Sequence, residues 1–224
     1  MPETIKIAYL YEDLMNTYGD SGDVKILAFL FKEKGYDTQV DNISLGDDFN
    51  AFDYDFVFWG GGQDFEQSVV AKDLVRHKDT IDKYINANKP MLCICGGYQF
   101  LGAYYETSSG ETIQGLDILP FHTVFKADSR MIGDTEYETE WGKVCAFENH
   151  SGRTYFDDKS VLKPFGKMIE GYGNNPEEGV EGMRYKNTIG SYSHGPILKN
   201  ENVARAIADK IIVSHKERMA ETAK

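Results

Sequence analysis

The stretch "KPMLCICGGYQFLG" (89–102) joins an apolar run to two glycines and a second apolar run. The first run has the length and composition of a buried strand, and the glycines allow a sharp turn. The residues that follow return to a pattern typical of a helix. Since Cys95 lies at the turn, the stretch predicts a strand-to-helix elbow that holds a thiol at the end of a strand.

Strand and helix patterns alternate on both sides of this elbow. The expected strands are 5–11, 38–45, 54–62 and 90–95, and the expected helices are 22–37, 66–88 and 97–107. Alternation of this kind builds a mostly parallel sheet that is covered by helices on both faces. The first half of the chain therefore predicts an α/β fold.

The second half has a different pattern, in which polar residues, glycines and aromatics alternate. Antiparallel strands and turns are expected over 133–156, a turn-rich segment over 171–187, a last strand over 188–198 and a final helix from Glu201. A chain of this length commonly forms one α/β unit. We therefore expect a single domain over 1–224, with a polar tail at 218–224 that frays.

Composition excludes several classes of function. The formal net charge of -12 argues against nucleic-acid binding, which depends on clustered Lys and Arg. No apolar run approaches the roughly 20 residues of a membrane span, and the first residues lack the basic region of a signal peptide. An odd set of three cysteines does not indicate a disulfide framework. We expect a cytoplasmic protein without direct membrane insertion.

Three polar or glycine-bearing loops follow expected strands, at 12–23, 60–67 and 95–99. In doubly wound sheets such loops converge at the carboxyl ends of the strands, where ligands bind. The helix N-terminus after Cys95 is expected to favour the thiolate. Backbone N–H groups of Gly96 and of the glycine loop, at Gly61 and Gly62, are expected to face an oxyanion.

The spacing of Cys93 and Cys95 does not fit a metal site or a redox pair. A zinc site requires further Cys or His ligands in similar arrays, and a thioredoxin-like pair requires Cys-x-x-Cys rather than Cys-x-Cys. No metal ligands are therefore expected, and Cys93 is interpreted as a small buried residue. A purely structural strand-to-helix turn at Cys95 remains an open alternative.

A catalytic thiol needs a base, and His194 is the best candidate. It ends an apolar strand and is followed by Gly195 and Pro196, which terminate the strand at the same edge as Cys95. The other histidines are expected at the surface or in turns and loops: His77, His122, His150 and His215. The pair predicted for catalysis is therefore Cys95 and His194.

Three stretches together carry a family resemblance. "CICGGYQFLG" (93–102), "GGGQDFEQ" (60–67) and "SYSHGPIL" (191–198) resemble the elbow, oxyanion loop and histidine strand of class I glutamine amidotransferase domains of the cobyric-acid-synthase-like branch. Within that branch, "LYEDLMNTYGDSGD" (10–23) and "ENHSGRT" (148–154) are most similar to the glutaminase subunits of lipid II isoglutaminyl synthases. The resemblance covers nearly the entire chain. It implies a flavodoxin-like domain with a mostly parallel sheet and an antiparallel extension.

The resemblance also implies a reaction. Cys95 attacks the side-chain amide of L-glutamine, a γ-glutamyl thioester forms, ammonia leaves with His194 handling the proton, and water releases glutamate. Gln99 matches a position that helps to hold the substrate. Arg130 resembles an arginine that engages glutamine, which suits a planar cation facing an α-carboxylate. The alternative for Arg130 is a surface arginine on a loop.

Many family members carry a carboxylate two residues after the histidine, but Pro196 stands there in this chain. The resemblance therefore implies a Cys–His dyad in a heterodimer with a Mur-ligase-like subunit (MurT), whose aspartate supplies the third catalytic carboxylate. The isolated chain is expected to be a poor glutaminase. No P-loop is present, so no cofactor is expected on this chain, and ATP and Mg are expected on the partner.

The partner is expected to amidate the D-glutamate α-carboxylate of lipid II to D-isoglutamine, which places the complex peripherally at the inner membrane face. Alternatives are a glutaminase for another acceptor, such as a corrinoid carboxylate, and a non-catalytic binding module. A hydrolase of the stress-protein type is disfavoured, since Gly96 stands where those proteins have histidine. The segment 15–23 is expected to contact the partner or shape a tunnel mouth, or to be a plain loop.

Overall fold

A mostly parallel sheet forms the centre of the structure, a computed structural model that describes residues 2–127 and 130–222. Its six strands lie in the order β13-β14-β4-β3-β1-β2, and every pair except β13–β14 is parallel. The strands are β1 (Thr4–Leu10), β2 (Asp37–Ile43), β3 (Phe56–Trp59), β4 (Met91–Ile94), β13 (Met183–Tyr185) and β14 (Thr188–Ser191). Apart from the antiparallel edge strand, this is the flavodoxin-like strand order, so the expected α/β fold is confirmed.

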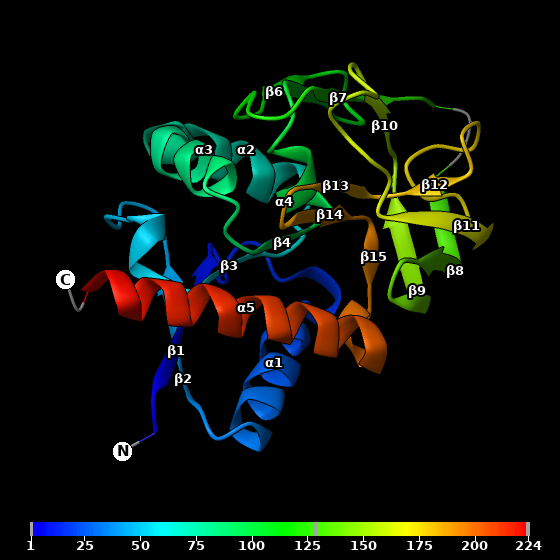
Figure 1. Ribbon diagram of the computed structural model, residues 1–224. Coiled ribbons are helices and arrows are strands. Elements are labelled where there is room, and N and C mark those ends of the chain that lie inside the picture. Colours follow the sequence, from blue (N-terminus) through cyan, green and yellow to red (C-terminus); the bar gives the residue numbers. More distant parts are fainter. Residues whose placement is uncertain (1, 128–129, 223–224) are drawn as a thin grey trace.

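Helices cover both faces of this sheet (Figure 1). Helices α2 and α3 lie on one face, and α1 packs beside α5 on the other. Their bounds are α1 (Ser21–Glu33), α2 (Asp64–Leu74), α3 (Lys78–Asn86), α4 (Gly96–Gln99) and α5 (Glu201–Thr222). The strands β1, β3 and β4 are almost wholly buried, as expected for a sheet that is covered on two sides.

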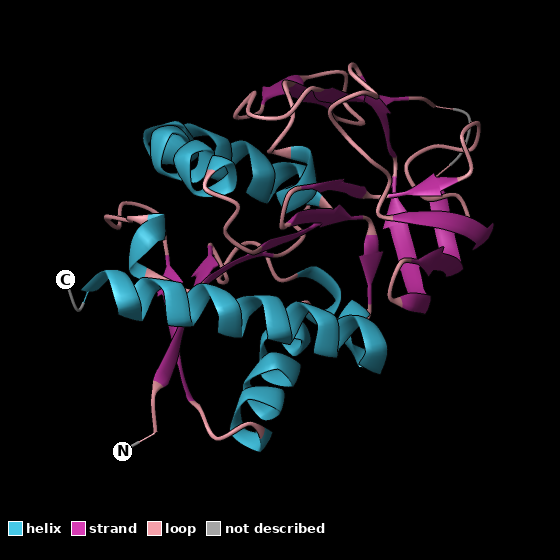
Figure 2. Ribbon diagram, viewed as in Figure 1, coloured by secondary structure: helices cyan, strands magenta, loops and turns pink. Residues whose placement is uncertain are grey.

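Two smaller sheets, antiparallel except for the parallel pair β5–β7, form the strand-rich side of the molecule (Figure 2). One contains β5 (Tyr104–Glu106), β6 (Thr112–Gln114), β7 (Phe121–Phe125) and β10 (Gly152–Phe156). The other contains β8 (Met131–Thr139), β9 (Gly142–His150), β11 (Gly166–Glu170), β12 (Val180–Glu181) and β15 (Ser193–His194). The chain passes from β14 in the central sheet to β15 in an antiparallel sheet, so His194 lies where the two sheets meet. The antiparallel extension is confirmed.

Two predicted helices differ from the observed elements. The helix expected over 66–88 is divided into α2 and α3 by a 3-10 turn at Val75–His77. The helix expected over 97–107 is a single turn, because the returning segment 116–119 donates its amides to the carbonyl oxygens of 100–102. These carbonyls are therefore not used by a continuing helix.

The C-terminal helix ends close to its predicted end. The sequence predicted a helix over 201–221 with a tail that frays after 218; α5 is helical to Thr222, and 223–224 lie outside the described residues. Arg218 holds this end because its Nε and Nη2 donate to the buried carboxylate of Asp55 at 2.6 and 3.0 Å. Among the helices described, none combines the length and apolar character needed to cross a bilayer.

Candidate active site

The loops that follow β1, β3 and β4 meet at the carboxyl edge of the central sheet, together with the end of β15. Gly61 lies at the point of convergence. A Cβ atom there would lie 2.8 Å from His194 Cε1, 3.1 Å from Cys95 Cβ and 3.2 Å from Asp20 Oδ2. Glycine is therefore required at this position, because any side chain would displace the groups around it. The convergence expected from the sequence is confirmed.

Cys95 occupies the predicted elbow. Its backbone has φ 50° and ψ -105°, a conformation that is strained for any residue other than glycine. The Cys95 N–H donates to the carbonyl of Ser191 at 2.7 Å, which ties the elbow to β14. At Gly97 a Cβ atom would lie 2.7 Å from the carbonyl oxygen of Trp59, so the turn closes only with glycine there. Strain of this kind is common at active sites, where it fixes a reactive side chain.

The helix after the elbow contributes less than expected. We expected a full helix whose N-terminus favours the thiolate, but α4 spans only Gly96–Gln99. One turn aligns few peptide dipoles, so its field is weaker than that of a long helix. The charge of the thiolate must therefore be balanced mainly by a neighbouring side chain.

His194 is that neighbour, and a carboxylate of the same chain orients it. Its Nδ1 lies 2.8 Å from Asp20 Oδ1, and the two side chains are 1% and 0% exposed. Burial alone would lower the pKa of His194, but the charge and hydrogen bond of Asp20, together with Cys95, raise that pKa to about 10. At neutral pH the imidazole is therefore protonated and can donate a proton.

A carboxylate of this chain, Asp20, occupies the position on His194 Nδ1 that we expected a partner to fill. Asp20 lies 174 positions from His194 in the sequence, at the start of α1. No carboxylate flanks His194 in the sequence, so the neighbouring residues gave no indication of the contact with Asp20. The only signal was the segment 15–23 that follows the first strand, for which a partner contact, a tunnel mouth or a plain loop was expected instead.

The same aspartate changes the expected oxyanion donors. Asp20 Oδ2 accepts the backbone N–H of Gly61 at 2.7 Å. Gly61 is therefore not a free donor, and its expected role facing the oxyanion is wrong. Gly62 lines the cavity beside Cys95, and Gly96 begins α4. Their two amides remain the donors that we expect to face an oxyanion.

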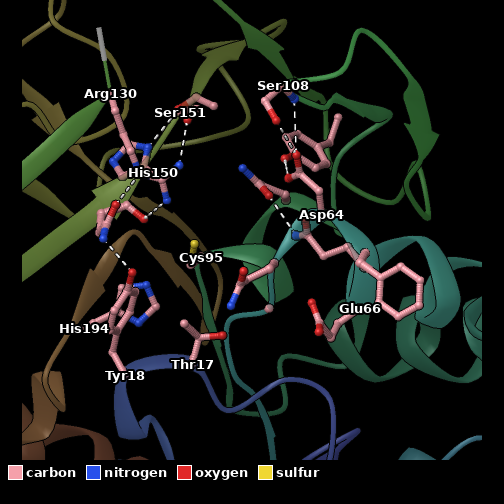
Figure 3. Close-up of a pocket in the computed structure, with 18 residues that line it drawn as sticks. Thr17, Tyr18, Asp64, Glu66, Cys95, Ser108, Arg130, His150, Ser151 and His194 are labelled. Carbon is pink, nitrogen blue, oxygen red and sulfur yellow. Dashed lines mark hydrogen bonds between the residues drawn. The ribbon is translucent and has the colours of Figure 1, made fainter.

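Tyr18 packs on His194 and is itself half exposed to solvent. Its ring meets that of His194 edge to face, with centroids 5.0 Å apart, and Tyr18 is 49% exposed. The Tyr18 hydroxyl accepts from Asn149 Nδ2, and Asn149 Oδ1 accepts from Arg130 Nε. A chain of contacts thus joins the histidine to the arginine on the pocket wall (Figure 3).

The pocket above Cys95 is a cavity of about 400 Å³. Cys95, Gln99, Arg130 and His194 all line it, so these four predicted residues are brought together. Arg130 Nη1 also donates to Ser151 Oγ at 3.0 Å, and its partners among the described residues are neutral oxygens. No carboxylate among the described residues pairs with the Arg130 guanidinium in these contacts, so it can bind an anion in the cavity.

Gln99 is held within a buried hydrogen-bond network. Its Oε1 accepts from Gln67 Nε2 at 2.9 Å, and its Nε2 donates to the Tyr192 hydroxyl at 3.1 Å. The ring of His150 stacks on Tyr192, with centroids 3.7 Å apart and planes inclined by 8°. His150 was placed in a polar loop, with a position in the site as the less favoured alternative; it lines the pocket and stacks on the residue that holds Gln99.

The other histidines have structural partners. His77 and His215 were expected on solvated helix surfaces, but they are 3% and 1% exposed. His215 Nδ1 lies 3.0 Å from Asp55 Oδ2, beneath the end of α5. Both lie on the inward faces of their helices, where charged neighbours in the sequence concealed the burial.

The sequence and the fold of this chain are similar to those of known glutamine amidotransferases. Residues 6–202 match the CobB/CobQ-like glutamine amidotransferase domain. The chain is 46% identical over 210 residues to lipid II isoglutaminyl synthase (glutamine-hydrolyzing) subunit GatD of Streptococcus pneumoniae, covering 91% of this chain and 78% of that one. It is 38% identical over 208 residues to the GatD subunit of Staphylococcus aureus, covering 92% and 84%. The structure of PurLQS from Thermotoga maritima has a similar fold, with a TM-score of 0.55 and 17% identity over 98% of this chain and 100% of that one.

Proposed function

Since this chain belongs to the CobB/CobQ-like glutamine amidotransferase family, we propose that it is the glutamine-hydrolysing subunit of a lipid II isoglutaminyl synthase. The observation that carries the proposal is the buried arrangement of Cys95, His194 and Asp20 beneath a cavity that Arg130 lines. The similarity over most of the chain to two subunits of that name supports the same acceptor chemistry.

Hydrolysis begins when the Cys95 thiolate attacks the side-chain amide carbon of glutamine, and a carbon–sulfur bond forms. The oxyanion is stabilised by backbone amides, for which Gly62 and Gly96 are the candidates. His194 donates its proton to the amide nitrogen, the carbon–nitrogen bond breaks, and ammonia leaves. His194 then accepts a proton from water, which attacks the thioester and releases glutamate. Asp20 keeps the imidazole oriented throughout.

The ammonia is used by a partner subunit, for which a MurT-like Mur ligase is our proposal. That subunit would bind ATP and Mg and amidate the D-glutamate α-carboxylate of lipid II to D-isoglutamine. The present chain supplies ammonia and needs no cofactor for the hydrolysis. We place the complex in the cytoplasm, where it meets lipid II at the inner membrane face.

The proposal is tested by intact-mass spectrometry with the glutamine analogue 6-diazo-5-oxo-norleucine. We expect one adduct on the wild-type chain and none on Cys95→Ser. Cys145→Ser is the matched control, because Cys145 is exposed and lies outside the pocket, and this variant should still form the adduct. An adduct that persists in Cys95→Ser contradicts the assignment of the nucleophile.

A second measurement addresses the acceptor. The chain is copurified with its partner, and amidation of lipid II is followed in the presence of glutamine and ATP. Formation of D-isoglutamine supports the proposed acceptor. A partner that amidates a corrinoid carboxylate instead would leave the glutaminase intact and overturn the acceptor.

A further inference from the structure

Two carboxylates in the pocket, Asp64 and Glu66, have no role in the chemistry described so far. Asp64 lines the same cavity as Cys95 and Arg130, and Figure 3 shows it on the side of the pocket opposite Arg130. We propose that Asp64 binds the α-ammonium group of the substrate, while Arg130 binds its α-carboxylate. This inference rests on the proposed glutaminase function and makes the pocket specific for a free amino acid.

The carboxylate of Asp64 is fixed in place by neighbouring donors. The Tyr105 hydroxyl donates to Oδ1, and Ser108 donates to Oδ2 through its backbone N–H at 3.2 Å and its hydroxyl at 2.9 Å. A carboxylate accepts about four hydrogen bonds, so three donors leave capacity for one more. A fixed acceptor with remaining capacity is suited to an ammonium group that arrives with the substrate.

The charge of Asp64 also lacks a cationic partner of its own. Among the ion pairs of the described residues, none involves Asp64, and its three donors are neutral hydroxyl and amide groups. The carboxylate is only partly buried and faces the cavity. An ammonium group bound there would meet an uncompensated negative charge.

The chemistry of glutamine requires this pairing. With the amide carbon held at Cys95, the α-carbon lies at the other end of the substrate and carries one positive and one negative group. Arg130 alone would accept any carboxylate that bears a terminal amide, whether or not an α-ammonium group is present. Asp64 across the cavity would distinguish glutamine from such analogues, because the ammonium group gains a charged acceptor.

A simpler interpretation is that Asp64 only ties Ser108 to the start of α2. The two interpretations differ in their dependence on the substrate. Loss of a structural tie would weaken the hydrolysis of every amide substrate, whereas loss of an ammonium-binding group would affect only substrates with an α-ammonium group.

The experiment compares glutamine with glutaramate, which lacks the α-ammonium group, in the copurified complex. For Asp64→Asn we expect kcat/KM for glutamine to fall by about 10- to 100-fold, mainly through KM, as charge-assisted hydrogen bonds are lost. The value for glutaramate should stay within about threefold of wild type, as for a site that does not contact the changed group. Asp79→Asn is the matched control, because Asp79 is exposed on α3 and does not line the pocket.

Three outcomes would overturn the proposal. Equal losses for both substrates would assign Asp64 a structural role, and no loss for glutamine would remove it from the site. Loss of discrimination in Glu66→Gln rather than Asp64→Asn would transfer the role to Glu66, which lines the same cavity and has a buried carboxylate oxygen without a partner among the described residues. A wild-type complex that hydrolyses neither substrate and is not labelled at Cys95 would instead refute the glutaminase function.

Discussion

Replacing Asp20 with asparagine tests how the catalytic histidine is controlled. Asp20 accepts the Gly61 N–H through Oδ2 at 2.7 Å and faces His194 Nδ1 through Oδ1 at 2.8 Å. In Asp20→Asn the single carbonyl oxygen must remain on the Gly61 side, since that amide needs an acceptor. The new NH₂ group then faces His194 Nδ1 and forces this nitrogen to become an acceptor. The proton moves to Nε2, which leaves the wrong tautomer for accepting a proton from the thiol.

The structure gives the size of the effect. The charge and hydrogen bond of Asp20 are the largest contributions that raise the pKa of His194, to about 10 from 6.5. Loss of that charge lowers the pKa of His194 and weakens its hold on the proton. We expect kcat to fall by about 10²- to 10⁴-fold, the range for neutralising the carboxylate of a triad.

The assay is steady-state release of glutamate, together with the pH dependence of iodoacetamide alkylation at Cys95. Asp23→Asn is a matched control, because Asp23 lies one turn away on α1 and is equally buried, and burial raises the pKa of its carboxyl group. Asp23 Oδ1 accepts the Leu198 N–H, which asparagine preserves. If kcat and the alkylation profile of Asp20→Asn match wild type within threefold, the assignment of Asp20 is refuted. Rescue of Asp20→Asn by the partner would show that the partner's carboxylate acts instead.

Further substitutions test the surroundings of the triad. In Gly61→Ala the new methyl group would press on His194 and Cys95, so we expect kcat to fall by about 100-fold with an unchanged circular dichroism spectrum. In Arg130→Gln we expect KM for glutamine to rise by about 10- to 100-fold, with kcat within a few-fold of wild type, in initial-rate measurements. Burial raises the pKa of Glu181 to about 7 from 4.5, so the contribution of Glu181 to the unfolding free energy should fall by about 3 kcal/mol as pH rises from 4.5 to 7. Urea titrations should show that Glu181→Gln lacks this loss. If the unfolding free energies of wild type and Glu181→Gln change with pH in the same way, this prediction is wrong.

The elements that the sequence predicted correctly are those with local causes. The apolar runs of β1, β3 and β4 are buried strands, and the glycines after Cys95 mark a turn whose closure requires them. His194 could be placed at the sheet edge because Gly195 and Pro196 end its strand. These features depend on neighbours in the chain, so a single sequence contains the information.

The features that the sequence concealed depend on contacts between distant segments. Asp20 reaches His194 only because the loop after β1 and the crossover from β14 to β15 meet at one edge. The amide of Gly61 is occupied by the same aspartate, which no local pattern could indicate. The helix after the elbow ends early because the amides of 116–119 donate to the carbonyl oxygens of 100–102, which a longer helix would use. Local helix propensity is overridden there by tertiary hydrogen bonds.

If Cys95, His194 and Asp20 act as the triad that we propose, the carboxylate that orients His194 comes from this chain. We then expect activation by a partner to act on the groups that cover the site. Tyr18 is the residue best placed for this, because it is half exposed, packs on His194 and is linked through Asn149 to Arg130. A surface that docks on Tyr18 would therefore act on the base and on the substrate carboxylate together. In such a complex the partner would control when glutamine is hydrolysed, while Asp20 would determine whether His194 can act at all.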